Sequence, residues 1–293
     1  MCSHANFLKP GIFLQHYSFQ FHYPLRIHTN MSGTASPPRG LPTSLQTQHN
    51  LTVLISGEGT NLQALIDACA SKPPAPGFTN TSISHVVSNK KEAGGLRRAE
   101  RAGIHTTYHN LVKYKKRCPD NLDQAREEYD TDLAKIILTN QPKPDLVVCA
   151  GWMHILKPRF IDSLTDANVP IINLHPAQPG QFDGANAIAR AWEAYQRGEI
   201  ASTGVMVHHV IAEVDQGQPI IVEDVDCRPD EPLADLEARI HEVEWKAIVQ
   251  GTKMVLDEIR NGQKGEAAHA SGKTGTVIDL EGGMARETAS ITQ

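Results

Sequence analysis

The chain has 293 residues, of which 40% are hydrophobic and 21% are charged, and its formal net charge is −5, which is typical of an ordinary soluble globular protein. The sequence contains no block rich in Lys and Arg and no apolar run long enough to span a bilayer, so we expect neither nucleic acid nor a membrane as a partner. Its five scattered cysteines lack CxxC spacing, which favours a reducing, cytoplasmic location and argues against a metal site.

Both ends of the chain differ in composition from the middle. Residues 1–50 contain no Asp or Glu, and the first acid in the chain is Glu58. We interpret this segment as a disordered leader, with a targeting segment for an organelle, or a true start at Met31, as alternatives. Residues 262–293 are rich in Gly, Ala, Ser and Thr, which predicts a flexible tail. The folded domain is therefore expected over residues 51–261.

Apolar, β-branched runs alternate with helix-length segments through the middle of the chain. The strand-like runs are LTVLIS, ISHVVS, DLVVCAG and VPIINL, and helical patterns separate them near residues 60–71, 92–102 and 124–141. This alternation predicts an α/β fold with a Rossmann-like, mostly parallel sheet and helices on both faces. After residue 200, GVMVHHVIAEV and PIIVEDVDC flank DQGQ and predict a β-hairpin, and a long helix is expected over about 232–260.

The first predicted strand runs into SGEGTNLQALIDACA, a Gly-containing turn followed by a helix. Such a turn places main-chain N–H groups at the carboxyl end of the sheet, where Gly59, Thr60 and Asn61 could line an anion site. The segment lacks the Lys of a nucleoside-triphosphate loop and the third Gly of a dinucleotide fingerprint. A tight turn in which Thr60 or Asn61 caps the helix is an equally good interpretation of this segment alone. Glu58 counts against a phosphate unless its side chain points away.

Two polar side chains end the strand in VPIINLHPAQPG. Asn173 and His175 are two residues apart, so a strand places both on one face, and Pro176 stops the ladder behind them. The carboxyl ends of parallel strands share one edge of the sheet, and Asp215 in the turn EVDQGQP could reach the same edge. An amide and an imidazolium can donate to an oxyanion while a carboxylate orients the imidazole. Taken singly, each residue is better interpreted as structural: a turn cap, a buried histidine and an ordinary turn residue.

Four segments together are more specific than any of these residues alone. The segments are LISGEGTNLQALIDA, VVCAGWMHILKP, INLHPAQPGQFDGANAI and GVMVHHVIAEVDQGQPII, and in this order and spacing they resemble the phosphoribosylglycinamide formyltransferase family of purine synthesis. The resemblance covers about residues 51–250. The segments NLHP and DQGQPI are shared by transferases that use 10-formyltetrahydrofolate, whereas SGEGTNLQALIDA is more specific to the glycinamide ribonucleotide branch.

The resemblance implies a formyltransferase fold and transfer of the formyl group of 10-formyltetrahydrofolate to the amine of 5-phosphoribosylglycinamide through a tetrahedral oxyanion, without a metal. It implies that Asn173 and His175 hold the oxyanion and that Asp215 supports the histidine. The positions implied for the ribonucleotide are Gly59, Thr60, Asn61 and, with less similarity, Glu244. The positions implied for the folate are Arg126, Met153, His154, Ile155, Leu156 and Asn173, where the segment 153–156 acts largely through its main chain.

The chain departs from the family pattern at three places. Glu58 stands where the turn usually has a small or neutral polar residue, and His154 stands where many members have Arg. The usual HPSLLP reads HPAQPG here, so residues 177–180 are expected to shape the mouth of the site differently.

Three other functions are weighed against this one. A methionyl-tRNA formyltransferase would need a further, basic C-terminal domain, and residues after 261 are too few and too polar to form one. A formyltetrahydrofolate hydrolase would need a regulatory domain in front, for which residues 1–50 lack the strand and helix pattern. A non-catalytic nucleotide-binding module would have no reason to bring Asn173, His175 and Asp215 together, so their convergence discriminates it from an enzyme.

Overall fold

The computed structural model describes residues 48–71 and 78–271, without the side chains of 263–271. The described residues belong to one compact unit, Gln46–Gln293. The predicted leader up to residue 47 and the predicted tail from residue 272 lie outside the described residues, so the proposed domain boundaries there stay predictions.

A seven-stranded sheet runs through the described residues, with the strand order β3-β2-β1-β4-β5-β6-β7. Its first five strands pair in parallel, and the last two are antiparallel. The strands are β1 (His49–Ile55), β2 (Thr81–Ser88), β3 (His105–Tyr108), β4 (Leu146–Cys149), β5 (Ile171–His175), β6 (Ser202–His209) and β7 (Pro219–Asp226). The chain order reverses between β1 and β4, and ligands of such sheets bind outside the carboxyl ends of the strands at this point.

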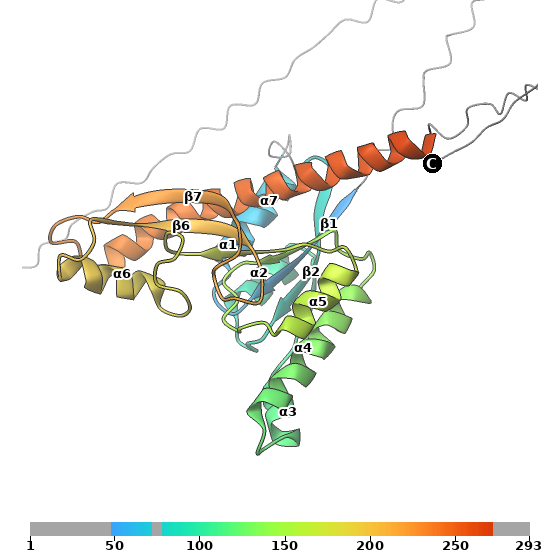
Figure 1. Ribbon diagram of the computed structural model, residues 1–293, viewed down its shortest axis with the longest axis horizontal. Helices are drawn as coiled ribbons and strands as arrows, with labels where there is room; N and C mark the ends of the chain where they lie inside the picture. Colours follow the sequence, from blue (N-terminus) through green and yellow to red (C-terminus); the bar gives the residue numbers. More distant parts are fainter. Residues whose placement is uncertain (1–47, 72–77, 272–293) are drawn as a thin grey trace, which may run out of the picture. The chain divides into compact units, whose positions relative to one another are not determined.

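Helices cover both faces of this sheet (Figure 1). They are α1 (Thr60–Ala70), α2 (Gly94–Arg101), α3 (Val112–Arg117), α4 (Leu122–Leu138), α5 (Pro158–Asp166), α6 (Ala187–Gln196) and α7 (Leu233–Ser271). Side chains alternate along a strand, so Val53 and Ile55 pack in one core with α1, α2 and α7. Leu54 faces the opposite way and packs in the second core with α4 and α5. The predicted α/β fold with helices on both faces is therefore confirmed.

The structure contains short elements that the hydrophobic pattern did not predict: β3, α3, α5 and α6. β3 has four residues, none of them buried, so it carries no apolar pattern. α5 begins with Pro158 at its first turn, a position that suits proline because its missing N–H would have no partner within the helix.

Two predicted boundaries are wrong. The strand expected to continue to Val214 ends at His209, and residues 210–218 form a loop, because Val210 to Val214 line a cavity instead of pairing with β7. The last helix continues to Ser271 rather than ending near residue 260. Its buried stripe, which includes Leu236, Ile240, Ile248 and Leu256, packs on the sheet and holds the helix against the core.

Candidate active site

A cavity of about 290 Å³ lies outside the carboxyl ends of β4 and β5. Four stretches of chain contribute to it, and its mouth carries two strongly exposed apolar side chains, Met153 and Ile155. The lining residues are Cys149, Gly151 to Leu156, Asn173 to Pro176, Gly184, Ala185, His208 and Val210 to Asp215. The position agrees with the rule for open α/β sheets, and the predominantly apolar wall with a few polar groups is typical of a small-molecule site.

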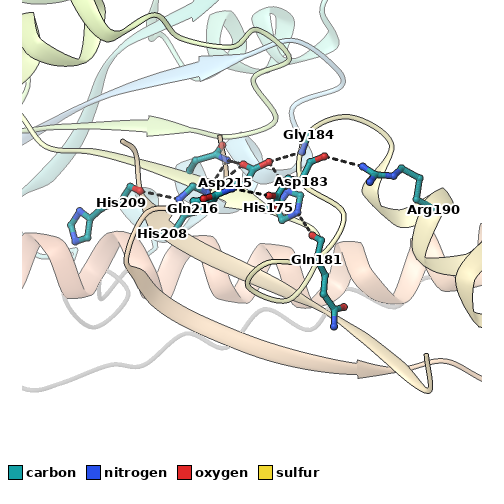
Figure 2. A network of polar contacts seen from close by, with 10 residues as sticks. His175, Gln181, Asp183, Gly184, Arg190, His208, His209, Asp215 and Gln216 are labelled. Atoms are coloured by element: carbon teal, nitrogen blue, oxygen red, sulfur yellow. Dashed lines mark hydrogen bonds and ion pairs between the residues drawn. The ribbon is translucent and has the colours of Figure 1, made fainter. Parts of the chain in front are cut away.

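The structure brings Asn173, His175 and Asp215 together on this cavity. Figure 2 shows His175 beside Asp215. Asn173 Nδ2 donates to Asp215 Oδ1 at 3.2 Å. His175 Nδ1 lies 3.4 Å from Asp215 Oδ2. Asn173 and His175 come from one face of β5, as the spacing of two residues predicted, and Asp215 comes from the loop after β6.

Several donors surround the Asp215 carboxylate. Besides Asn173, the main-chain N–H of Gly184 donates to its Oδ2 at 2.8 Å, and His208 Nε2 lies 3.5 Å from its Oδ1. Burial alone would raise the pKa of Asp215, but His208, the Gly184 N–H and the charge of His175 lower it below the ordinary value of an aspartate. Asp215 is therefore held as an anion. Its backbone is left-handed, with φ 57°, a conformation that aspartate tolerates better than most residues.

Both nitrogens of the His175 ring face acceptors. Nδ1 faces Asp215, and Nε2 lies 3.0 Å from the main-chain oxygen of Gln181. The ring can donate to both acceptors at once only when both nitrogens carry a hydrogen. His175 is thus placed to act as an imidazolium, and donation to a bound substrate requires the exchange of one of these contacts, as is common for catalytic groups before the substrate binds.

His208 joins this cluster, and the sequence interpretation did not single it out. Its Nδ1 lies 2.9 Å from the main-chain oxygen of His209, and its Nε2 lies 3.2 Å from Asn173 Nδ2. Nε2 also lies 3.5 Å from Asp215 Oδ1, so this nitrogen donates to the carboxylate or accepts from Asn173, depending on which ring nitrogen carries the hydrogen. The signal was the strand pairing, since His208 lies directly opposite Asn173 and therefore on the same face.

The four positions implied for the folate in the loop after β4, Met153 to Leu156, line the cavity. The His154 ring turns inward, and its Nε2 lies 2.7 Å from Asp130 Oδ1 on α4. Arg126, the other implied folate residue, is exposed on α4 and is not among the residues that line the cavity.

The positions implied for the ribonucleotide lie at a separate place, where β1 meets α1. Gly59 has a φ of 73° and precedes the helix, which begins at Thr60. In the described part of the chain, no side chain caps this helix, so the alternative in which Thr60 or Asn61 is the cap is wrong. Asn61 instead donates from Nδ2 to Glu244 Oε2 on α7 at 3.0 Å.

Glu244 differs from Asp215 in its surroundings. Burial raises the pKa of Glu244, and the hydrogen bond from Asn61 and the charge of His241 offset only part of this effect. The buried stripe of α7 contains this acid beside Ile240, Ala247 and Ile248, a position that acids rarely occupy without a partner.

The neighbouring helix α2 supports the glycine turn. The Gly95 N–H donates to Gly57 O at 3.1 Å, and Arg98 Nε donates to Glu58 O at 2.8 Å. A Cβ at Gly94 would lie 2.4 Å from Glu58 Oε2, so the Glu58 carboxylate lies against the N-terminus of α2, where a negative charge is favourable. Arg98 is a cation beside the glycine turn that the sequence interpretation missed, because only the packing of α2 brings it there.

Within residues 48–71 and 78–271, no three His, Cys, Asp or Glu side chains gather in a way that could hold a metal ion. Across the same residues, every helix falls short of the length or the apolar character needed to cross a membrane.

Comparison with known proteins agrees with this architecture. Residues 49–252 match the formyl transferase family. The chain is 46% identical to phosphoribosylglycinamide formyltransferase of Schizosaccharomyces pombe, over 71% of this chain and 98% of the relative, and 45% identical to that of Dictyostelium discoideum, over 70% and 97%. The crystal structure of phosphoribosylglycinamide formyltransferase from Campylobacter jejuni is similar with a TM-score of 0.60 at 30% identity, over 71% of this chain and 98% of that chain. The chain belongs to the phosphoribosylglycinamide formyltransferase family.

Proposed function

We propose that this chain transfers the formyl group of 10-formyltetrahydrofolate to the amine of 5-phosphoribosylglycinamide in purine biosynthesis, with Asn173, His175 and Asp215 as its catalytic residues. The observation that supports this most directly is the convergence of these three side chains on a cavity that the residues after β4 also line.

The cavity suits the folate. Its volume of about 290 Å³ is near the lower end of the range for small-molecule pockets, and Trp152, Leu156 and Val210 give it an apolar lining that suits a flat ring system. Main-chain groups of residues 153–156 can hydrogen-bond the polar edge of such a ring. The exposed side chains of Met153 and Ile155 would cover the part of the folate that leaves the cavity.

The glycine turn suits the phosphate of the ribonucleotide. The first N–H groups of α1 lack partners within the helix, and the helix N-terminus favours an anion. Arg98 adds a positive charge beside the turn. Among the described residues Asn61 Oδ1 is buried without a hydrogen-bond partner, so Asn61 and Glu244 can receive hydroxyl groups of the sugar.

The chemistry follows from where charge develops. The amine of the ribonucleotide attacks the formyl carbon, and negative charge grows on the formyl oxygen. Asn173 and His175 donate hydrogen bonds to this oxygen once each has exchanged one contact within the cluster. The Asp215 anion stabilises the imidazolium throughout. The carbon–N10 bond then breaks, and the proton lost by the amine is delivered to N10 of the folate.

The test is a formyl-transfer assay with the purified chain, 10-formyltetrahydrofolate and glycinamide ribonucleotide, following release of tetrahydrofolate. Asn173→Ala and His175→Ala should each lower kcat by on the order of 10²–10³. His209→Ala is the matched control, because His209 lies on β6 beside His208 but does not line the cavity. Rates like the wild type in either cavity variant would remove that residue from its catalytic role.

The same assay separates the alternatives. Release of formate without the ribonucleotide would indicate a hydrolase, and folate binding without transfer would mean that the acceptor is a different amine.

We also propose that residues 51–261 form the catalytic domain and that the enzyme is cytoplasmic. A variant that begins at Met31 should keep its activity, and loss of activity would contradict the interpretation of this segment as a leader.

A further inference from the structure

A carboxylate in the second core holds the wall of the cavity. Asp130 lies on α4 and is fully buried. Its Oδ1 lies 2.7 Å from His154 Nε2, and its Oδ2 accepts from the main-chain N–H of Lys157, also at 2.7 Å. The Asp130 side chain therefore fixes two residues of the loop 153–157. His154 lies 24 residues after Asp130 in the sequence, and Lys157 lies 27 residues after it.

The His154 ring is held in one orientation. It is 9% exposed and makes edge contacts with Tyr129 at 4.8 Å and with Trp152 at 6.2 Å between ring centroids. A third anchor lies at the start of the loop, where the Met153 N–H donates to Ser56 Oγ at 2.7 Å. Between these anchors the main chain of residues 153–156 is presented to the cavity.

A buried carboxylate strongly opposes movement of its partners. An unpaired charge in a core is far less favourable than one with two hydrogen bonds, so displacement of the loop would leave Asp130 without partners. An apolar residue would fill the core without this constraint. The two hydrogen bonds of Asp130 thus couple the position of the cavity wall to the packing of α4.

We infer that Asp130 and His154 are positioning residues for the folate, and that they act by holding the main chain of residues 153–156 in the geometry that binds it. This inference rests on the proposed function. Neither side chain takes part in the transfer step, so their loss affects binding of the folate rather than of the ribonucleotide. The role of His154 is to donate to Asp130, and another long donor can replace it.

The test uses four variants of the full chain: Asp130→Asn, His154→Ala, His154→Arg and, as the matched control, Asp132→Asn. An amide at position 130 keeps the volume but can accept from only one of the two donors. Asp132 lies on the same helix and contacts Tyr114 and Lys135 rather than the loop. KM and kcat are measured for each substrate, and folate binding is measured directly by fluorescence titration.

Asp130→Asn and His154→Ala should raise the KM and the dissociation constant for the folate by about tenfold, because a smaller fraction of the molecules has a competent cavity wall. The KM for the ribonucleotide and kcat should stay within about threefold, and His154→Arg and Asp132→Asn should resemble the wild type. If Asp130→Asn does not fold, the comparison of His154→Ala with His154→Arg decides the question.

Three results would overturn the inference: an unchanged folate KM in His154→Ala, equal rises in KM for both substrates, or a failure of His154→Arg to restore the folate KM. These results are distinct from failure of the proposed function, in which the wild-type chain itself would transfer no formyl group to the ribonucleotide.

Discussion

Two carboxylates, the partly buried Asp215 and the buried Glu244, belong to the two proposed substrate sites, and their pKa values are shifted in opposite directions. Asp215 is surrounded by Asn173, His175, His208 and the Gly184 N–H, and its pKa is lowered. Glu244 accepts one hydrogen bond, from Asn61, and its pKa is raised by burial. Asp215 is less deeply buried than Glu244 and has more donors around it, and each donor stabilises the charged form that burial opposes.

This difference has a functional meaning. A carboxylate that stays charged can stabilise an imidazolium throughout a reaction, whereas a carboxyl group whose pKa is raised takes its charge less readily and suits hydrogen bonds to a neutral sugar. The following variants test whether the two sites depend on charge to different extents.

Removal of the Asp215 charge should have the largest effect. Asp215→Asn keeps the shape and can still accept from the Gly184 N–H, but it no longer stabilises a charged His175. We expect kcat to fall by on the order of 10²–10³, with a KM for each substrate close to that of the wild type. Steady-state kinetics on a variant with an unchanged circular dichroism spectrum is the measurement. A loss below about threefold would show that the charge is not needed.

Removal of His208 should have a weaker effect than removal of the Asp215 charge itself. His208→Ala takes away a group that lowers the pKa of Asp215, so this pKa should rise. The acid limb of kcat/KM, recorded with an acid-stable formyl folate analogue, should therefore move to higher pH, and kcat should fall by roughly tenfold as Asn173 loses a partner. An unmoved acid limb would mean that Asp215 does not control the profile.

Substitution of Gly59 in the glycine turn should strain the backbone. Gly59 has a φ of 73°, and a Cβ there would lie 2.5 Å from Gly95 Cα. Gly59→Ala should lower the free energy of unfolding by roughly 1–3 kcal/mol and raise the KM for the ribonucleotide. Gly57→Ala is the matched control, because a Cβ at Gly57 would have no described atom within 4 Å. Denaturant titration measures the free energy of unfolding of both variants. An equal loss in the two variants would contradict a special backbone requirement at Gly59.

Replacement of Glu244 should have the smallest effect. Glu244→Gln keeps an acceptor for Asn61, so the KM for the ribonucleotide should rise only about three- to tenfold. Because the folded pKa is raised above the ordinary value of 4.5, wild-type stability should decrease as pH rises from 4.5 toward the raised pKa, and the Gln variant should lack this slope. Urea titrations across this pH window measure the slope, and an equal slope in both proteins would contradict the raised pKa.

The sheet was predictable because its signals are local. Apolar runs buried on both faces predicted the strands around Val53, Val148 and Ile172, and these strands are parallel as expected. Short elements such as β3 and α3 escaped prediction because they contribute few buried side chains. The hairpin was predicted, but the early end of its first strand was not, since Val210, Ile211, Ala212 and Val214 line the cavity instead of extending the strand.

The sequence by itself determined the α/β class, the pairing of Asn173 and His175 on one face and the chemical character of the site, because periodicity and residue type are properties of a local segment. Tertiary structure alone decided that His208 lies opposite Asn173, that Arg98 reaches the glycine turn and that Asp130 holds the cavity wall. Each of these contacts joins segments that are 24 or more residues apart, and their geometry depends on strand order and helix packing, which local patterns do not specify.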